Sequence, residues 1–549
     1  MVQEHLIFMK TNKYLVAIVV LSLVLRVWDL GNIPPHLSSD EASLGYNAYS
    51  ILKTGRDEYG KLFPIIFKSF GDYKPGLYIY FSVPVVAILG LTEFAIRLPS
   101  AIMGGVAVVL VYFLSKNILN SRKMGLFTAF ALSINPWHIH FSRGAWEANL
   151  AFTLTIAGIL AFLLSFEKRK WLYVSALFFG LTMVAYQGAK LTSLISLVVL
   201  ILIYFKDLKQ IDKQTLAGSF FVGLIISSPI IYSFFVGQTG RLEVFSIFSY
   251  PRESWYVDKL LSEGEEQRGS ASYLLYHSEL LSFFQGIVGR WFNHFSGRFL
   301  FFQGDWENSR HGIPGLGQLL FADLLALLIG TFYLIKSKSI ATKSKLLLMM
   351  LFLLSPLPAA LSRSQVNAVR SMNMVLPLVI ILGIGMNYMF AQKRWVFLYF
   401  AMYIFSFIYF VDAYFVHLPV HNVRSWNWGY REMVNYILSV ESNYDEIQIQ
   451  QSYRQPYVYF LFYGRYDPTS YQKKSHLIEN EFGDVGLVEG FDKYVFKSIN
   501  WPVGETDKRI LYIGDEVTIA RELGSSKNYV LEKEIKYLDG TTAFMAIHD

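Results

Sequence analysis

Long stretches of this sequence carry almost no charge. The most prominent cover residues 15–25, 101–114, 191–205, 220–236 and 346–361. An α-helix needs ~20 mainly apolar residues to cross the hydrocarbon core of a bilayer, and several of these stretches reach or approach that length. Only 17% of the residues are charged, whereas about a quarter is usual in globular proteins. The sequence therefore predicts an α-helical polytopic membrane protein.

Two further features narrow the class of protein. The first apolar run follows Lys10 and Lys13, but no small-residue cleavage site comes after it, so we interpret it as an uncleaved span. The chain has no cysteine, which excludes disulfides, thiolate metal sites and cysteine nucleophiles. The net charge of +7 is spread between the apolar runs, which indicates contact with lipid headgroups and no nucleic-acid partner.

The basic residues orient the chain, because loops rich in Lys and Arg stay in the cytoplasm. The basic connections are at 116–123, 168–170, 206–213, 336–345 and 393–394, and one assignment places all of them inside together with the N-terminus. It has about eleven transmembrane helices, at 14–30, 99–115, 124–136, 149–166, 171–187, 190–205, 215–235, 317–335, 346–361, 372–390 and 395–411. We therefore expect a multi-pass protein of the plasma membrane with its C-terminus outside the cytoplasm.

The segment 76–91 is apolar enough to cross the membrane, but Pro84 interrupts it. Counting it as a span would move the basic loops that follow to the outer side. We therefore interpret it as a re-entrant or interfacial helix on the outer side. The transmembrane domain then covers residues 1–411, with long outer loops at 31–98 and 236–316.

Residues 412–549 form the predicted extracytoplasmic part. Helix-like stretches at 429–440 and 455–463 mix with strand-like ones, which cover 446–451, 494–498, 509–513, 529–535 and 542–547. Asp539-Gly540 between the last two strands has the composition of a hairpin turn. This pattern predicts a small soluble α/β domain.

The first candidate for chemistry is the acidic pair Asp40-Glu41, shortly after the first span. A carboxylate at the membrane surface can act as a general base towards a hydroxyl or amine, or hold a divalent cation. A structural alternative is that Ser38, Ser39 or Asp40 caps a helix over residues 42–53. Capping needs one such residue and does not exclude catalysis.

Outer basic residues are the second group of candidates. Lys74 stands in a turn beside Asp72 and Tyr73, and could meet a phosphate or simply extend towards the membrane surface. Arg97 precedes a span on the outer side, where either a functional role or a lipid headgroup would explain it. Arg370 lies in the outer turn 362–371.

Three further outer segments carry polar side chains. Arg143 and Glu147 are spaced to pair on a helix, whereas His138 and His140 would face apart and do not predict a metal site. The long second loop adds His294 and His311, which we expect to bind substrate together with Tyr46, Asp72, Tyr73 and Glu147. Acids, arginines, a lysine and histidines thus collect above an apolar bundle, as a phosphorylated lipid requires.

These residues, in this order, resemble the GT-C class of glycosyltransferases. The similarity is to the protein O-mannosyltransferases and the lipid A aminoarabinose transferases, whose acidic pair after the first span matches Asp40-Glu41. Further family motifs match Lys74-Pro75-Gly76-Leu77, Arg97-Leu98-Pro99-Ser100-Ala101 and Ser142-Arg143, with Gly76 in place of a second proline. The resemblance covers residues 25–390, most strongly before residue 150.

The resemblance implies a GT-C fold and a polyprenyl-phosphate sugar donor held on the outer side. Asp40 would deprotonate a hydroxyl or amine of a glycan, lipid or protein acceptor, and the lipid phosphate would leave with inversion. Lys74 with one or more of Arg97, Arg143 and Arg370 would neutralise that phosphate. Glu41 would position the acceptor or assist a cation, and the resemblance fixes no metal.

Two other classes of function remain open from the sequence. A transporter or flippase of lipid-linked sugars would place ionisable residues near the bilayer midplane, whereas here the spans are almost free of charge. A non-catalytic scaffold could use aromatic residues such as Tyr457 and Tyr459 to stack on sugar, although these residues also fit an apolar helix face in a small core.

Overall fold

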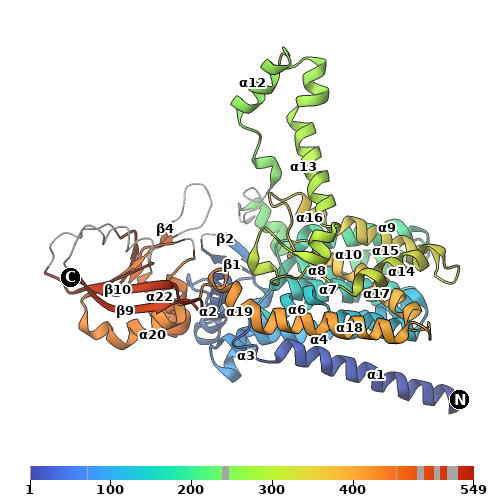
Figure 1. Cartoon of the computed structure of the whole chain (residues 1–549), viewed down its shortest axis with the longest axis horizontal. Coiled ribbons are helices and arrows are strands. Elements are labelled where there is room, and N and C mark those ends of the chain that lie inside the picture. Colours follow the sequence, from blue (N-terminus) through green and yellow to red (C-terminus); the bar gives the residue numbers. More distant parts are fainter. Residues whose placement is uncertain are drawn as a thin grey trace.

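The structure is a computed structural model. It describes residues 2–70, 72–237, 246–452, 454–475, 477–478, 487–499, 507–515 and 529–548, with side chains from residue 13 onward. Its long helices run side by side in a bundle, with the N-terminus at one end and the strand-rich C-terminal region at the other (Figure 1).

Each predicted span coincides with a helix of the bundle. These helices are α1 (Val2–Val27), α4 (Glu93–Leu119), α5 (Arg122–Ser133), α7 (Glu147–Leu164), α8 (Trp171–Ala185), α9 (Ala189–Leu208), α10 (Lys213–Phe235), α14 (Asp323–Lys336), α15 (Thr342–Leu354), α17 (Val375–Met389) and α18 (Val396–Asp412). Within the described ranges, seven helical segments are long and apolar enough to cross a membrane. The predicted polytopic membrane protein is thereby confirmed, while the number of crossings and the side of each terminus stay predictions.

Shorter elements connect these helices. The first long loop holds α2 (Ser39–Thr54), the strands β1 (Ile66–Ser69) and β2 (Asp72–Pro75), and α3 (Leu77–Leu89), which contains Pro84. Further short helices are α6 (Pro136–Arg143), α12 (Ser254–Glu263), α13 (Glu279–Asn293), α16 (Leu357–Ala360) and α19 (Leu418–His421). α3 packs against α2 and α4, so the segment with the interrupting proline joins the rest of the first outer loop to the helix that follows it, and its position relative to the membrane stays a prediction.

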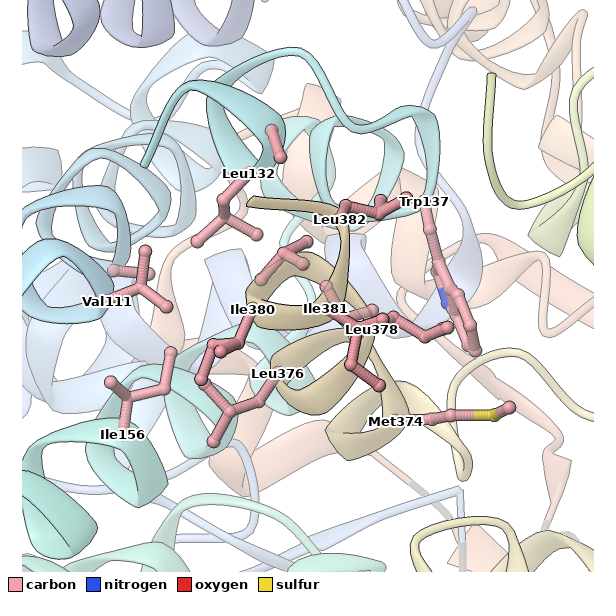
Figure 2. Packing of buried hydrophobic residues seen from close by; sticks show 14 of the residues in the cluster. Val111, Leu132, Trp137, Ile156, Met374, Leu376, Leu378, Ile380, Ile381 and Leu382 are labelled. Carbon is pink, nitrogen blue, oxygen red and sulfur yellow. The ribbon is translucent and has the colours of Figure 1, made fainter. Parts of the chain in front are cut away.

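The bundle packs around α17, whose residues are buried on all sides (Figure 2). Close approach of helices depends here on glycine. A Cβ atom on Gly385 would lie 1.9 Å from the carbonyl oxygen of Ala326, and one on Gly330 would lie 2.1 Å from that of Ile381. Small residues let the backbones of membrane helices approach closely, so these glycines bring α14 and α17 together.

The C-terminal region is an α/β unit, as the sequence pattern predicts. Its helices are α20 (Tyr430–Val440), α21 (Tyr457–Tyr463) and α22 (Pro468–Lys474), and its strands are β3 (Glu446–Gln450), β4 (Leu477–Ile478), β5 (Leu487–Val488), β6 (Gly490–Phe491), β7 (Tyr494–Lys497), β8 (Ile510–Gly514), β9 (Val530–Lys536) and β10 (Thr542–His548). Six strands form a mixed sheet in the order β6-β7-β3-β8-β10-β9. Gly540 has a φ of 85° in the turn between β9 and β10, which agrees with the predicted hairpin.

This α/β unit shares an apolar core with the first outer loop. Residues of α2 and α3 belong to the same buried cluster as those of α20 and α21. Gly45 of α2 lies so close to Phe462 that a Cβ atom would come within 2.6 Å of its ring. Tyr457 and Tyr459 are buried in this core, so in this structure they pack α21 and are not exposed to stack on sugar. The division of the chain at residue 411/412 into two domains stays a prediction.

A buried carboxyl in the first outer loop makes stability sensitive to pH. Glu58 is fully buried; the Asn47 amide donates to its Oε1 at 3.3 Å, and its Oε2 has no hydrogen-bond partner among the described residues. Burial raises the pKa of Glu58 to about 8. Because this pKa is higher in the folded than in the unfolded chain, the folded state is favoured most below pH ~4.5 and loses that stability as the pH rises to about 8.

We therefore expect Glu58→Gln to stabilise the protein at high pH only. Thermal unfolding of the detergent-solubilised chain should show a Tm several degrees above wild type at pH 9 and nearly equal to it at pH 5, because one pKa unit corresponds to ~1.4 kcal/mol. Glu167→Gln, at an exposed position, is the matched control. Equal effects of Glu58→Gln at both pH values would show that the buried carboxyl is not the cause.

Candidate active site

A polar cavity of about 520 Å³ opens where the first outer loop meets the end of the bundle. Its walls come from α2, β2, the start of α7, the end of α8 and two loops at 305–311 and 364–370. The lining residues are Ser39, Asp40, Phe70, Asp72, Lys74, Pro75, Trp146, Glu147, Ala148, Tyr186, Gln187, Asp305, Glu307, Asn308, Arg310, His311, Ser364, Val366, Asn367, Val369, Arg370 and Gln455. Segments far apart in the sequence thus build a single site.

The local structure of α2 aims Asp40 into this cavity. Ser38 is the N-cap of α2 and forms a capping box with Glu41, in which each side chain accepts a hydrogen bond from the other residue's backbone N–H. The cap fixes the first turn of the helix. Asp40 comes between the two and keeps 44% of its side chain exposed, on the cavity side.

The β1–β2 hairpin brings Lys74 to Asp40. The strands pair antiparallel, with Phe67 opposite Lys74. The Lys74 ammonium donates a hydrogen bond to Oδ1 of Asp40, and the Arg310 guanidinium lies 3.8 Å from Oδ2. Burial lowers the pKa of Lys74, but the negative charges of Asp40 and Glu147 outweigh it and hold this pKa above its ordinary value. Lys74 is therefore a persistent cation beside the carboxylate.

Asp305 organises the opposite wall of the cavity. Its Oδ2 accepts hydrogen bonds from the backbone N–H of Ala368, at 2.8 Å, and from Nδ1 of His311, at 3.1 Å. Burial lowers the pKa of His311 even though the Asp305 carboxylate raises it. The imidazole is therefore neutral near pH 7 and ties the 305–311 loop to the 364–370 loop, which carries Arg370.

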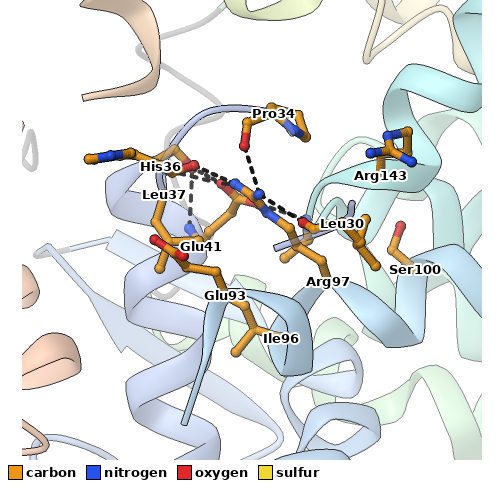
Figure 3. Close-up of polar contacts among 12 residues, drawn as sticks. Leu30, Pro34, His36, Leu37, Glu41, Glu93, Ile96, Arg97, Ser100 and Arg143 are labelled. Atoms are coloured by element: carbon orange, nitrogen blue, oxygen red, sulfur yellow. Dashed lines mark hydrogen bonds and ion pairs between the residues drawn. The ribbon is translucent and has the colours of Figure 1, made fainter. Parts of the chain in front are cut away.

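Glu41 and Arg97, predicted to contact substrate, are not among the residues that line the cavity; Figure 3 shows them paired with each other and with the 30–36 segment. Arg97 is fully buried, and its Nε donates to Oε1 of Glu41 at 3.0 Å. Its Nη2 also donates to Oε2 of Glu41 at 3.3 Å, and the other N–H groups donate to the carbonyl oxygens of Leu30, Pro34 and His36. The guanidinium thus fastens the 30–36 segment and Glu41 to α4, and the geometry offers no support for phosphate binding by Arg97.

Arg143, like Arg97, holds backbone segments together. Its guanidinium is buried and donates to the carbonyl oxygens of Leu25, Trp28 and Ile33, at 2.7 to 2.9 Å. These bonds join the end of α6 to the end of α1. Arg143 does not line the cavity, so its predicted contact with the donor phosphate also lacks geometric support.

Three of the predicted substrate-binding residues are outside the cavity as well. The Tyr46 hydroxyl is buried against the C-terminal unit and donates to the carbonyl of Tyr466 at 3.2 Å. The carbonyl of Tyr73 accepts a hydrogen bond from the Gln187 side chain at 2.8 Å. His294 is buried, and its Nε2 accepts from the N–H of Asn367 at 3.1 Å. Asp72, Glu147 and His311 do line the cavity.

Sequence reasoning missed several lining residues, above all Arg310. It stands beside His311, a predicted substrate-binding residue, and an arginine on the outer side is the available signal. Tyr186, Gln187 and Asn367 have no comparable signal, because they reach the cavity only through the packing of distant loops. Among the described residues, no cluster of three or more His, Asp or Glu side chains could hold a metal ion.

The chain is similar to one known protein family and to solved structures. Residues 74–232 match the family described as dolichyl-phosphate-mannose-protein mannosyltransferase. The crystal structure of ArnT from Cupriavidus metallidurans bound to undecaprenyl phosphate is similar at a TM-score of 0.58 and 12% identity, over 97% of this chain and 98% of that chain. The chain has the GT-C fold. The apo structure of the same ArnT gives a TM-score of 0.56 at 13% identity, over 97% and 98% of the two chains.

The GT-C resemblance predicted from the sequence is thereby confirmed. The family match includes Lys74, Glu147 and the Tyr186-Gln187 pair of the cavity. No curated protein matches the chain. The roles of individual site residues stay predictions.

Proposed function

We propose that this GT-C protein is an inverting glycosyltransferase that moves a sugar from a polyprenyl-phosphate donor to an acceptor hydroxyl or amine on the outer face of the membrane. The observation that carries the proposal is the Asp40 carboxylate with Lys74 and Arg310 beside it in a polar cavity at the end of an apolar bundle. A base, cations for a phosphate and a neighbouring lipid phase are what such a reaction needs.

The geometry suggests how donor binding activates the base. Before binding, Lys74 and Arg310 are attracted to Asp40. A donor phosphate would compete for both cations, and this competition would release the carboxylate of Asp40. Asp40 then takes the proton of the acceptor hydroxyl as the acceptor oxygen attacks the anomeric carbon. The bond from that carbon to the phosphate oxygen breaks, and the phosphate leaves with the electron pair while Lys74 and Arg310 stabilise its charge.

A separate apolar groove of about 470 Å³ offers a place for the polyprenyl chain. It runs between α8, α9 and α10 and is lined by residues such as Phe179, Leu197 and Leu224. Lys190 belongs to its lining and follows Tyr186 and Gln187 of the polar cavity by four and three residues. A lipid with its phosphate in the cavity could therefore extend its chain along this groove into the membrane.

The direct test is sugar transfer by the purified protein in detergent. Labelled polyprenyl-phosphate sugars are offered with membrane extract as the source of acceptors. Transfer of label supports the proposal and leaves the acceptor to be identified. Absence of transfer with every donor, together with movement of the donor across liposome membranes, would instead support a transporter of lipid-linked sugars.

Filling the apolar groove should weaken binding of long-chain donors only. We expect Leu197→Trp to raise KM about tenfold for a long-chain donor, which equals ~1.4 kcal/mol of lost apolar contact, and to change KM little for a short-chain donor. Leu202→Trp, on the exposed face of the same helix and outside the groove, is the control. A similar effect of Leu197→Trp on both donors, or of Leu202→Trp on the long one, would place the chain elsewhere.

A further inference from the structure

A helical hairpin leaves the bundle at the end that carries the cavity. It consists of α12, a π-helical turn (Tyr273–His277) and α13. In Figure 1 it projects sideways, across the direction of the long helices. We call residues 251–293 the lateral arm.

One face of the lateral arm exposes large apolar side chains. On α13, Leu280 is 78% exposed and Phe284 is 62% exposed. They are four residues apart and therefore share a helix face, which Ile287 and Trp291 continue at helical spacing. On α12 and the π-helical turn, Trp255 is 65% exposed and Tyr276 is 67% exposed. We call the α13 face with Leu280, Phe284, Ile287 and Trp291 the apolar stripe of the arm.

Polar contacts within the hairpin hold the arm together. Arg252 donates to Glu279 at 2.9 Å, and Arg268 donates to Asp258 at 2.7 Å. Val257 and Leu261 of α12 are buried. These contacts hold the two helices of the hairpin together, and the exposed side chains of the apolar stripe take no part in them.

The base of the arm is fixed to the bundle. The side chain of Arg290 donates to the carbonyl of Ala360 at 2.8 Å, and Nε1 of Trp291 donates to that of Leu353 at 2.7 Å. The Asn293 amide donates to the carbonyl of Gln365 at 3.3 Å, in the loop that lines the cavity. These bonds set the direction of the arm relative to the helices that cross the membrane.

We propose that the lateral arm lies flat in the interface of the outer leaflet, with its apolar stripe towards the acyl chains. Because the arm runs across the bundle at one of its ends, it lies along the plane of a membrane that the bundle crosses. Its base contacts Leu353 of α15, a helix that also exposes Leu346 and Met349, so the arm adjoins an exposed apolar surface of the bundle. Trp and Tyr favour this interface, and amphipathic helices bury their apolar face ~5–10 Å into it.

The inference does not depend on which reaction the cavity performs, and its test needs no activity. The chain contains no cysteine, so single cysteines can carry a spin label without background. Leu280→Cys and Phe284→Cys place the label on the apolar stripe. Gln285→Cys and Gly289→Cys, both exposed on the same helix, place it on the polar side, and a Cβ atom at Gly289 meets no atom within 4 Å.

The labelled full-length variants are reconstituted into vesicles of phosphatidylcholine and phosphatidylglycerol at 3:1. At 280 and 284 we expect the label's accessibility to oxygen, relative to a water-soluble nickel chelate, to be several times higher than at 285 and 289. Equal accessibility at all four positions would place the stripe in water and overturn the proposal. Spin–spin broadening at 280 and 284 that disappears on dilution with unlabelled protein would instead identify a second copy of the chain as its partner.

Discussion

Asp40→Asn is expected to lower the rate of sugar transfer by ~10²–10⁴-fold, the usual contribution of a general base. The amide has nearly the same shape as the carboxylate, but it cannot accept the proton of an acceptor hydroxyl. Lys74, which donates to Asp40 in this structure, would be available to meet the donor phosphate. The loss should therefore appear in kcat, with KM for the donor unchanged or lower.

The assay compares Asp40→Asn with wild type at saturating donor, alongside Glu307→Gln as a matched control. Glu307 also lines the cavity. It is a suitable control because the carboxylate that pairs with Lys74 is that of Asp40. A loss confined to Asp40→Asn assigns the base to one carboxylate of the cavity. Near-normal transfer by a folded Asp40→Asn protein would exclude Asp40 as the base, and a raised KM with normal kcat would make it a binding residue.

The sequence predicts the elements of this fold far better than it predicts the site. Apolar runs mark helices that a bilayer surrounds, and β3, β7, β8, β9 and β10 all fall where alternating or β-branched residues indicate strands. Both signals are local, because they report which side of a short segment is buried. They carry no information on which loops meet.

The acidic pair is an example of a site that local sequence patterns do not predict. Asp40 and Glu41 are adjacent and chemically alike, but neighbouring residues on a helix point ~100° apart. Asp40 therefore faces the cavity, whereas Glu41 turns inward to cap its own helix and meet Arg97. The sequence indicates a cap at this position, but the partner that buries Glu41 is 56 residues away.

The arginines also show that residue type alone does not predict which side chains reach the cavity. Arg97, Arg143 and Arg310 are equally plausible phosphate ligands by residue type. The first two are surrounded by backbone carbonyls of the 25–36 region, and only Arg310 reaches the cavity beside Asp40. What separates them is the path of the loop after α1, which no periodicity encodes.

Removing the carboxylate of Glu41 is expected to be the most damaging single change to stability. Glu41→Ala leaves the buried Arg97 guanidinium without its anion, and breaking a buried pair in this way costs ~3–5 kcal/mol. The capping box of α2 is lost as well, at ~1 kcal/mol. Because marginal stability is typically ~5–15 kcal/mol, little folded protein should remain. The measurements are yield of monodisperse protein in detergent and thermal unfolding.

Three further variants separate a structural from a ligand-binding role for this pair. Arg169→Ala breaks an exposed pair with Asp212 and should cost less than ~1 kcal/mol. Glu41→Gln combined with Arg97→Met should be less harmful than the sum of the single changes, because neither charge is left alone in the interior. Arg97→Lys keeps the charge, but a single ammonium cannot reach Glu41 and three carbonyls together, so it should lower Tm without a selective loss of donor binding. If Arg97→Lys instead keeps its wild-type Tm and loses affinity for the donor, Arg97 contacts the phosphate in a conformation other than this one, and its role in fastening the 30–36 segment is secondary.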